Sequence, residues 1–146
     1  MNRRRFRLIS AIHVFFIRSG EILLLRRAKT GYQDGKFSVV AGHLDGNETV
    51  KQAAIREAQE EVDVILRPED LSVVQVMHRR SQDERIDWFL VTERWDGEIR
   101  NREPERCDLL AWHNLEDLPG NIIPYVAHAI NNYLADVWFD SFGWDS

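Results

Sequence analysis

Residues 42–64 read GHLDGNETVKQAAIREAQEEVDV, and this stretch decides more about the chain than any other. No Gly or Pro interrupts residues 50–62, three alanines favour helix there, and apolar side chains recur at the spacing of one buried stripe. Asn47 is a suitable N-cap residue, which would place Glu48 in a first turn where the helix dipole favours a carboxylate. The stretch therefore predicts a helix over residues 47–62.

Three carboxylates of this helix are crowded together. Glu57, Glu60 and Glu61 are three and four residues apart, so their side chains share one side of the helix. Like charges at that spacing repel by roughly a few tenths of a kcal/mol per pair. Arg56 could pair with Glu60 or reach back to Glu48. Hard carboxylate oxygens suit Mg²⁺ or Mn²⁺, so the cluster predicts a divalent cation, and a solvated acidic helix face is the alternative.

The spacing extends beyond the three carboxylates, to Gly42, Glu48, Arg56, Glu57, Ala58, Glu60, Glu61 and Val64. At these positions the chain resembles the signature of the Nudix hydrolases. Asp63 departs from it, because the family has Gly at this helix end, where a left-handed backbone is often required. Looser similarity to MutT-type members covers residues 91–98 (VTERWDGE), 103–107 (EPERC) and 118–121 (LPGN).

The resemblance implies a fold and an activity. The implied fold is α/β (α+β): a Nudix-type α/β/α sandwich with a mixed β-sheet, in which the signature forms a loop-helix-loop. The implied activity is that of a Mg²⁺-dependent pyrophosphohydrolase. It would cleave a nucleoside triphosphate to the monophosphate and pyrophosphate, as in MutT-like nucleotide-pool cleaning. The alternatives are hydrolysis of another nucleoside diphosphate derivative, such as ADP-ribose or a nucleotide sugar, and a non-catalytic Nudix-like nucleotide sensor.

The resemblance also implies roles for single residues. The implied ligands of Mg²⁺, or of Mn²⁺, are the carboxylates of Glu57, Glu60 and Glu61 and the carbonyl of Ala41 or Gly42. Arg56 would hold these carboxylates in place, and Glu48 would orient Arg56 or reach a second metal through water. Family members take their general base from the signature or from a later loop. Glu103 is the later candidate here, and Glu105 is its alternative.

Four residues outside the signature are candidates for substrate binding. Arg26 and Arg27 end a predicted strand, and their forked donors suit phosphate oxygens. Arg85 is a similar candidate, and Asn121 resembles an Asn that reads the purine edge in MutT-type members. Each has a structural alternative, since an Arg can lie on the solvated side of an edge strand and an Asn after Gly is an ordinary turn residue.

Composition limits the partners and the compartment. The net charge of −5 argues against stable, sequence-independent binding of nucleic acid, so a small-molecule nucleotide is the expected partner. A single cysteine, Cys107, allows no internal disulfide and fits the cytoplasm. No segment approaches the roughly 20 apolar residues that cross a membrane. We expect one Nudix domain over residues 1–146, acting as a monomer or a homodimer.

The remaining elements follow from hydrophobic periodicity and turn residues. Strands are predicted near residues 8–17, 21–27, 37–41, 71–79, 85–95 and 109–113. A last helix opens at Pro124. Its predicted apolar face consists of Val126, Ala129, Ile130, Tyr133, Leu134 and Val137.

Overall fold

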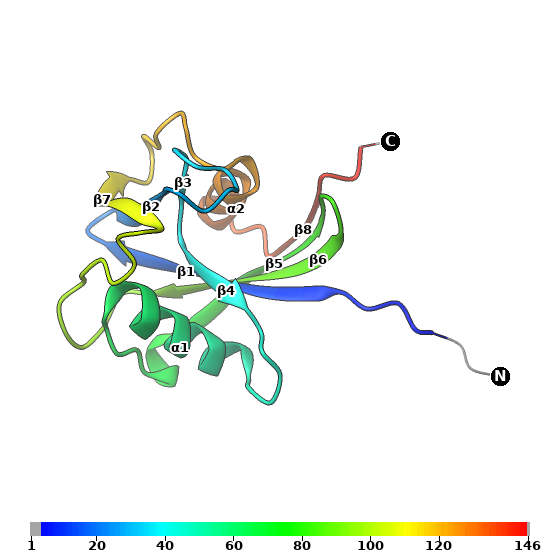
Figure 1. Cartoon of the computed structure of the whole chain (residues 1–146), viewed down its shortest axis with the longest axis horizontal. Coiled ribbons are helices and arrows are strands. Elements are labelled where there is room, and N and C mark those ends of the chain that lie inside the picture. The colour runs from blue at the N-terminus through cyan, green and yellow to red at the C-terminus, as the bar shows by residue number, and fades with distance from the viewer. Residues whose placement is uncertain (1–3, 146) are drawn as a thin grey trace.

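A mixed β-sheet with one helix on each face forms the body of the protein (Figure 1). The computed structural model describes residues 4–145. Its strands are β1 (Ile9–Arg18), β2 (Glu21–Arg27), β3 (Phe37–Ser38), β4 (Val40–His43), β5 (Ser72–Arg80), β6 (Glu84–Thr92), β7 (Cys107–Asn114) and β8 (Phe139–Phe142). Its helices are α1 (Val50–Val62), the 3₁₀ turn η1 (Pro68–Asp70) and α2 (Pro124–Leu134). The predicted α/β fold class is confirmed.

The sheet is organised around β1. The strand order is β3-β2-β1-β6-β5-β8, with β4 paired to β1 and β7 paired to β2. Strand β1 runs parallel to β6 along most of its length, whereas it is antiparallel to both β4 and β2. Residues 11–14 of β1 pair with β4, and residues 17–18 pair with β2. The antiparallel partner of β1 therefore changes from β4 to β2 toward the C-terminal end of the strand.

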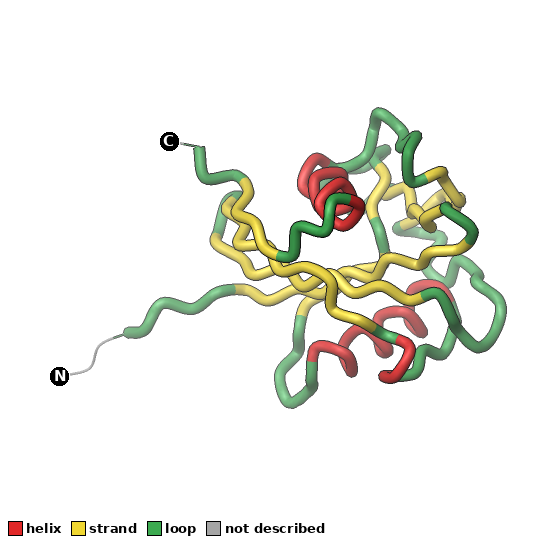
Figure 2. Tube along the Cα trace, turned by 180° about the vertical axis from the view of Figure 1, so that it is seen from behind, coloured by secondary structure: helices red, strands yellow, loops and turns green. Residues whose placement is uncertain are grey.

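Alternation along the strands separates two hydrophobic cores. Ile12, Val14 and Phe16 of β1 pack toward α1, while Phe15 and Ile17 point to the opposite face, because successive side chains of a strand alternate. Helix α1 contributes the small residues Ala53, Ala54 and Ala58, all fully buried, to the first core. Seen from behind, the two helices lie on opposite sides of the sheet (Figure 2). Small side chains let α1, which carries the acidic cluster, lie close to the strands.

The start of α1 differs from the prediction. Its N-cap is Thr49, not Asn47, because Thr49 and Gln52 form a capping box in which each side chain accepts from the other's backbone N–H, at 3.1 and 2.8 Å. Glu48 therefore precedes the helix and is not in its first turn. At the other end, Asp63 has φ 62°, so the position where the signature has Gly does require a left-handed backbone.

Three further predictions needed correction. The strand expected over residues 37–41 is divided at Val39, because β3 pairs with β2 and β4 pairs with β1. Helix α2 ends at Leu134, so Val137 lies beyond it and is 37% exposed. Strand β8 was not predicted, since its four residues are exposed or only half-buried. No helix among residues 4–145 is long and apolar enough to cross a membrane.

Candidate active site

A cavity of about 530 Å³ lies between α1, β4, the end of β2 and the loop that precedes β7. One wall carries the carboxylates predicted to bind metal, together with the predicted base. Cations from β2 and the two neighbouring loops form another part of the lining. The polar and charged lining includes Glu57, Glu60, Glu61, Glu103, Arg26, Arg27, Lys29, Asn101 and Arg106, beside the β4 residues Ala41 and Gly42. Residues more than 60 positions apart in the sequence thus meet at one cavity.

Gly42 allows β4 to approach the acidic wall closely. A Cβ atom at this position would collide with the side chain of Glu57. Helix α1 can therefore lay a carboxylate directly against the β4 backbone, next to the carbonyl of Ala41. The glycine of the signature is needed here for space, since its φ is not in the left-handed range.

Arg56 links the carboxylates of Glu48, Glu57 and Glu60. Its guanidinium donates to Glu48 Oε1 at 2.8 Å and to Glu57 Oε1 at 2.7 Å, and lies 3.6 Å from Glu60 Oε2. Nη2 also donates to the carbonyl of His43 at 3.1 Å. The hydrogen bonds to Glu48, above all other causes, raise the pKa of Arg56 and lower that of Glu48. Both expected contacts of Arg56 are present, and together they fix the side chain over the cluster.

Glu61 is the carboxylate of the cluster that has a buried oxygen without a partner. Its Oε2 atom is buried and has no hydrogen-bond partner. Burial raises the pKa of Glu61 well above its usual range, and the charges of Glu57 and Glu103 raise it further. A buried polar group without a partner costs about 1 to 3 kcal/mol, and more if it is charged. A cation with a preference for hard oxygen ligands would relieve this cost.

The donor set therefore fits a divalent metal, although the side chains do not converge around one point. Within residues 4–145, no three His, Cys, Asp or Glu side chains stand close enough together to hold an ion. Glu57 Oε1 is engaged with Arg56 instead. Glu60 lines the cavity and is half exposed, with 54% of its side chain accessible, so its carboxylate has room to rotate toward Glu57 and Glu61.

The candidate phosphate ligands fall into two groups. Arg26 and Arg27 line the cavity, but Arg26 is paired with Asp108 at 2.8 Å, and Arg27 donates to the carbonyl of Tyr32 at 2.8 Å. Arg85 and Asn121 are not among the lining residues. Arg85 donates to Asp83 Oδ1 at 2.8 Å. The amide of Asn121 donates to the carbonyl of Gly35 at 2.9 Å, which braces the loop over residues 28–36.

Comparison with known proteins decides the family. The NUDIX domain profile matches residues 7–134. The chain belongs to the Nudix family. This Nudix protein is 31% identical over 120 residues to the 8-oxo-dGTP diphosphatase of Escherichia coli (strain K12), covering 80% of its own length and 92% of the relative. It is therefore a Nudix hydrolase of the MutT-like type, and its substrates are nucleoside diphosphate-linked compounds.

Solved structures agree with this assignment. A MutT NUDIX hydrolase from Burkholderia pseudomallei superposes with a TM-score of 0.78 at 25% identity, covering 86% of this chain and 98% of that one. A MutT protein from Methanosarcina mazei Go1 has the same fold, with a TM-score of 0.76 at 18% identity over 88% of this chain and 94% of that one. Divalent metals are generally used in this family, which agrees with the donor set described above.

Among the lining residues of this Nudix hydrolase that were missed from the sequence, three bear directly on the site. Asn101 donates to the carbonyl of Cys107 at 2.6 Å and accepts from the backbone N–H of Glu103 at 3.0 Å, so it fixes the turn that carries Glu103. Arg106 is the basic residue of the EPERC element, which was a usable signal. Lys29 follows two arginines in a loop, and nothing in the sequence distinguishes it from other exposed lysines.

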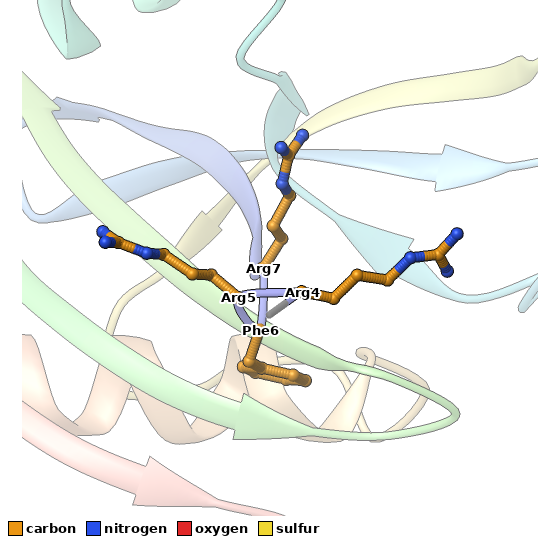
Figure 3. Close-up of a pocket in the computed structure, with 4 residues that line it drawn as sticks. All are labelled: Arg4, Arg5, Phe6 and Arg7. Atoms are coloured by element: carbon orange, nitrogen blue, oxygen red, sulfur yellow. The ribbon is translucent and has the colours of Figure 1, made fainter. Parts of the chain in front are cut away.

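A second hollow lies beside the segment that precedes β1. It is lined by Arg4, Arg5, Phe6 and Arg7. The three guanidinium groups point away from one another, and Phe6 points away from all three (Figure 3). Because the charges diverge, this hollow does not offer a shared anion site, and the cavity beside α1 remains the candidate active site.

Proposed function

We propose that this Nudix hydrolase is a Mg²⁺-dependent pyrophosphohydrolase that cleaves a nucleoside triphosphate to the monophosphate and pyrophosphate. The observation that carries the proposal is the buried Oε2 atom of Glu61, which has no hydrogen-bond partner, in a cavity that Glu61 shares with Glu57 and with several cations. The similarity to an 8-oxo-dGTP diphosphatase supports a triphosphate substrate. We further propose that the chain acts on small nucleotides in the cytoplasm as one Nudix domain.

In this proposal the acidic wall holds the cofactor. Glu57, Glu60 and Glu61, with the carbonyl of Ala41, would bind Mg²⁺, and Mn²⁺ would also suit these oxygens. When bound, the ion neutralises phosphate charge and lowers the pKa of a bound water. Arg56, oriented by Glu48, keeps Glu57 in position.

The later loop supplies the proposed base. Glu103 lines the cavity, and its charge acts on Glu61, so the two carboxylates lie near each other. Glu103 would accept the proton of the attacking water. Glu105, the alternative, is exposed and does not line the cavity. Because only Glu103 of the two lines the cavity, we assign the role of general base to Glu103.

The remaining side chains would orient the substrate. Arg26 and Arg27 would donate to phosphate oxygens inside the cavity. Arg85 and Asn121, which lie outside its lining, would contact only a part of the nucleotide that extends beyond the cavity. The base edge is the natural candidate for such a part, since Asn offers both a donor and an acceptor.

Pyrophosphate release from a panel of nucleotides tests the proposal. The panel contains ordinary, oxidised and methylated nucleoside triphosphates, with ADP-ribose and a nucleotide sugar in parallel, each with and without Mg²⁺ or Mn²⁺. We expect metal-dependent release from triphosphates, and a fall of about a thousandfold in kcat for Glu57→Gln and Glu61→Gln, because several kcal/mol of charge stabilisation are lost.

Two neighbouring acids provide the matched control for the base. Glu103→Gln should lower kcat strongly, whereas Glu105→Gln, two residues away in the same turn, should leave kcat near the wild-type value. An inert wild type would overturn the enzyme assignment, and preferential cleavage of ADP-ribose would replace the triphosphate with another nucleoside diphosphate derivative. Tight nucleotide binding without turnover would indicate a sensor.

A further inference from the structure

The cations that line the active-site cavity are not equivalent. Arg26 is paired with Asp108, and Arg27 is held by the carbonyl of Tyr32 and by Thr30 Oγ1. Lys29 and Arg106 line the same cavity, and neither side chain makes an ion pair or a hydrogen bond with any described residue. Both residues are exposed. Two positive charges at this cavity are therefore available to a ligand.

The fold brings these two cations to one part of the rim. Arg27 of β2 is opposite Cys107 of β7, and the backbone N–H of Ala28 donates to the carbonyl of Arg106 at 2.9 Å. The next residue along the first segment is Lys29, so its side chain and that of Arg106 start from adjacent backbone. Strand pairing between segments almost 80 residues apart thus creates the pair.

The turn that carries Arg106 also carries Glu103, an acid of the facing wall of the cavity. The backbone N–H of Arg106 donates to the carbonyl of Glu103 at 2.9 Å. Arg106 and the proposed base are therefore fixed relative to each other by one short turn. Lys29 has φ 55°, a left-handed conformation that costs a non-glycine residue about 1 kcal/mol. The surrounding structure therefore maintains this backbone conformation, which lysine does not prefer on its own.

We propose that Lys29 and Arg106 bind the terminal phosphates of the substrate and select nucleoside triphosphates over derivatives whose distal phosphate is esterified. The inference rests on the proposed function and names its specificity determinants. A free terminal phosphate carries roughly −1.5 to −2 charges near neutral pH, whereas an esterified one carries less. The carboxylate wall repels that added charge, and the two unpaired cations offset it.

Steady-state kinetics with matched cation controls test this proposal. Lys29→Ala and Arg106→Ala remove the proposed contacts. Lys36→Ala, from the same loop as Lys29, and Arg100→Ala remove cations that do not line the cavity. For dGTP with Mg²⁺, each of the first two variants should raise KM about tenfold or more and change kcat little, since one charge-assisted contact is lost.

Inorganic pyrophosphate separates this inference from the activity itself. Titration of wild type and variants with pyrophosphate, followed by calorimetry with MgCl₂ present, should show weaker binding in Lys29→Ala and Arg106→Ala only. Arg106→Lys should restore part of the affinity. The KM for ADP-ribose, wherever cleavage is measurable, should not change.

The possible outcomes are distinct. Unchanged dGTP and pyrophosphate affinity in both variants, or an equal loss in the Lys36 and Arg100 controls, would overturn the assignment of Lys29 and Arg106 while the proposed function stands. A wild type that cleaves no triphosphate would overturn the proposed function. In that case, selective loss of pyrophosphate binding in the two variants would still identify the phosphate site, and equal binding would dismiss it.

Discussion

The two faces of the sheet differ in whether their buried charged groups have partners within the protein. On the α2 face, Arg79 and Asp87 are 5% and 0% exposed, and their side chains form a two-point ion pair with a 2.6 Å contact from Nε to Oδ2. His13 lies beside them with Nε2 at 2.9 Å from the hydroxyl of Tyr125, whose ring lies 3.7 Å from the Arg79 guanidinium. Each charge in this group has a partner.

On the α1 face, the protein does not provide a partner for every buried carboxylate oxygen. Arg56 is shared among Glu48, Glu57 and Glu60, while Glu61 has a buried oxygen without a partner. Both groups carry the desolvation cost of burial, but only the α2 group is offset by protein atoms alone. A fold that satisfies buried charge on one face and leaves it unsatisfied on the other indicates where an external ion is required.

The largest stability effect is expected on the α2 face. Asp87→Asn keeps the shape of the side chain but leaves the Arg79 guanidinium buried without its counter-charge, which should lower the free energy of unfolding by about 3 to 5 kcal/mol. Asp83→Asn, which disrupts the partly exposed pair with Arg85, should cost less than about 1 kcal/mol. Urea denaturation of both variants measures the difference, and equal losses would remove the contrast between buried and exposed pairs.

The pH dependence of the free energy of unfolding tests the α2 face as well. Burial lowers the pKa of His13 from 6.5 to about 4, so the folded protein keeps this imidazole neutral while the unfolded chain protonates it. The stability due to neutral His13 is complete above pH 6.5 and is lost as pH falls toward 4, a change of about 3 kcal/mol.

Two histidine variants identify the origin of that slope. His13→Phe should flatten the dependence of the free energy of unfolding between pH 6.5 and 4. His43→Asn, at an exposed position, should retain the slope. A slope that survives in His13→Phe would assign it to other groups.

The smallest effect is expected at the end of α1. Asp63→Gly removes a side chain from a left-handed residue and should raise the free energy of unfolding by about 1 kcal/mol without a change in kcat. Ala135→Gly, after α2 at φ −96°, is the matched control and should be destabilising, because no left-handed backbone is needed there. Thermal denaturation and the nucleotide assay together check both expectations.

The acidic wall was predictable because its geometry is local. Glu57, Glu60 and Glu61 lie on one helix, so the 3.6-residue period alone brings them together. The expected contact of Arg56 with Glu48 is also present, although Glu48 precedes the helix and reaches Arg56 from the loop before it. The helix start was misplaced, because Asn47 and Thr49 are both good caps and the choice depends on the partner Gln52.

The pair of cations at the cavity, Lys29 and Arg106, was not predictable from the local sequence pattern. Lys29 and Arg106 meet because β2 pairs with β7 across almost 80 residues. The α2-face cluster was missed for a similar reason, since His13, Asp87 and Tyr125 come from three separate elements. Asn121 was chosen from resemblance and Arg85 for its forked donors, and their position outside the cavity lining depends on tertiary packing that neither argument addresses.

The central claim is that the acidic wall on the α1 face requires a bound cation, and chemical denaturation of wild type and Glu61→Gln with and without MgCl₂ tests it most directly. Without metal, the neutral variant should be more stable than wild type by about 1 to 3 kcal/mol, because it removes an uncompensated buried charge. Millimolar MgCl₂ should stabilise wild type and have much less effect on the variant. A variant that is less stable than wild type without metal, or that gains as much from MgCl₂, would contradict the account.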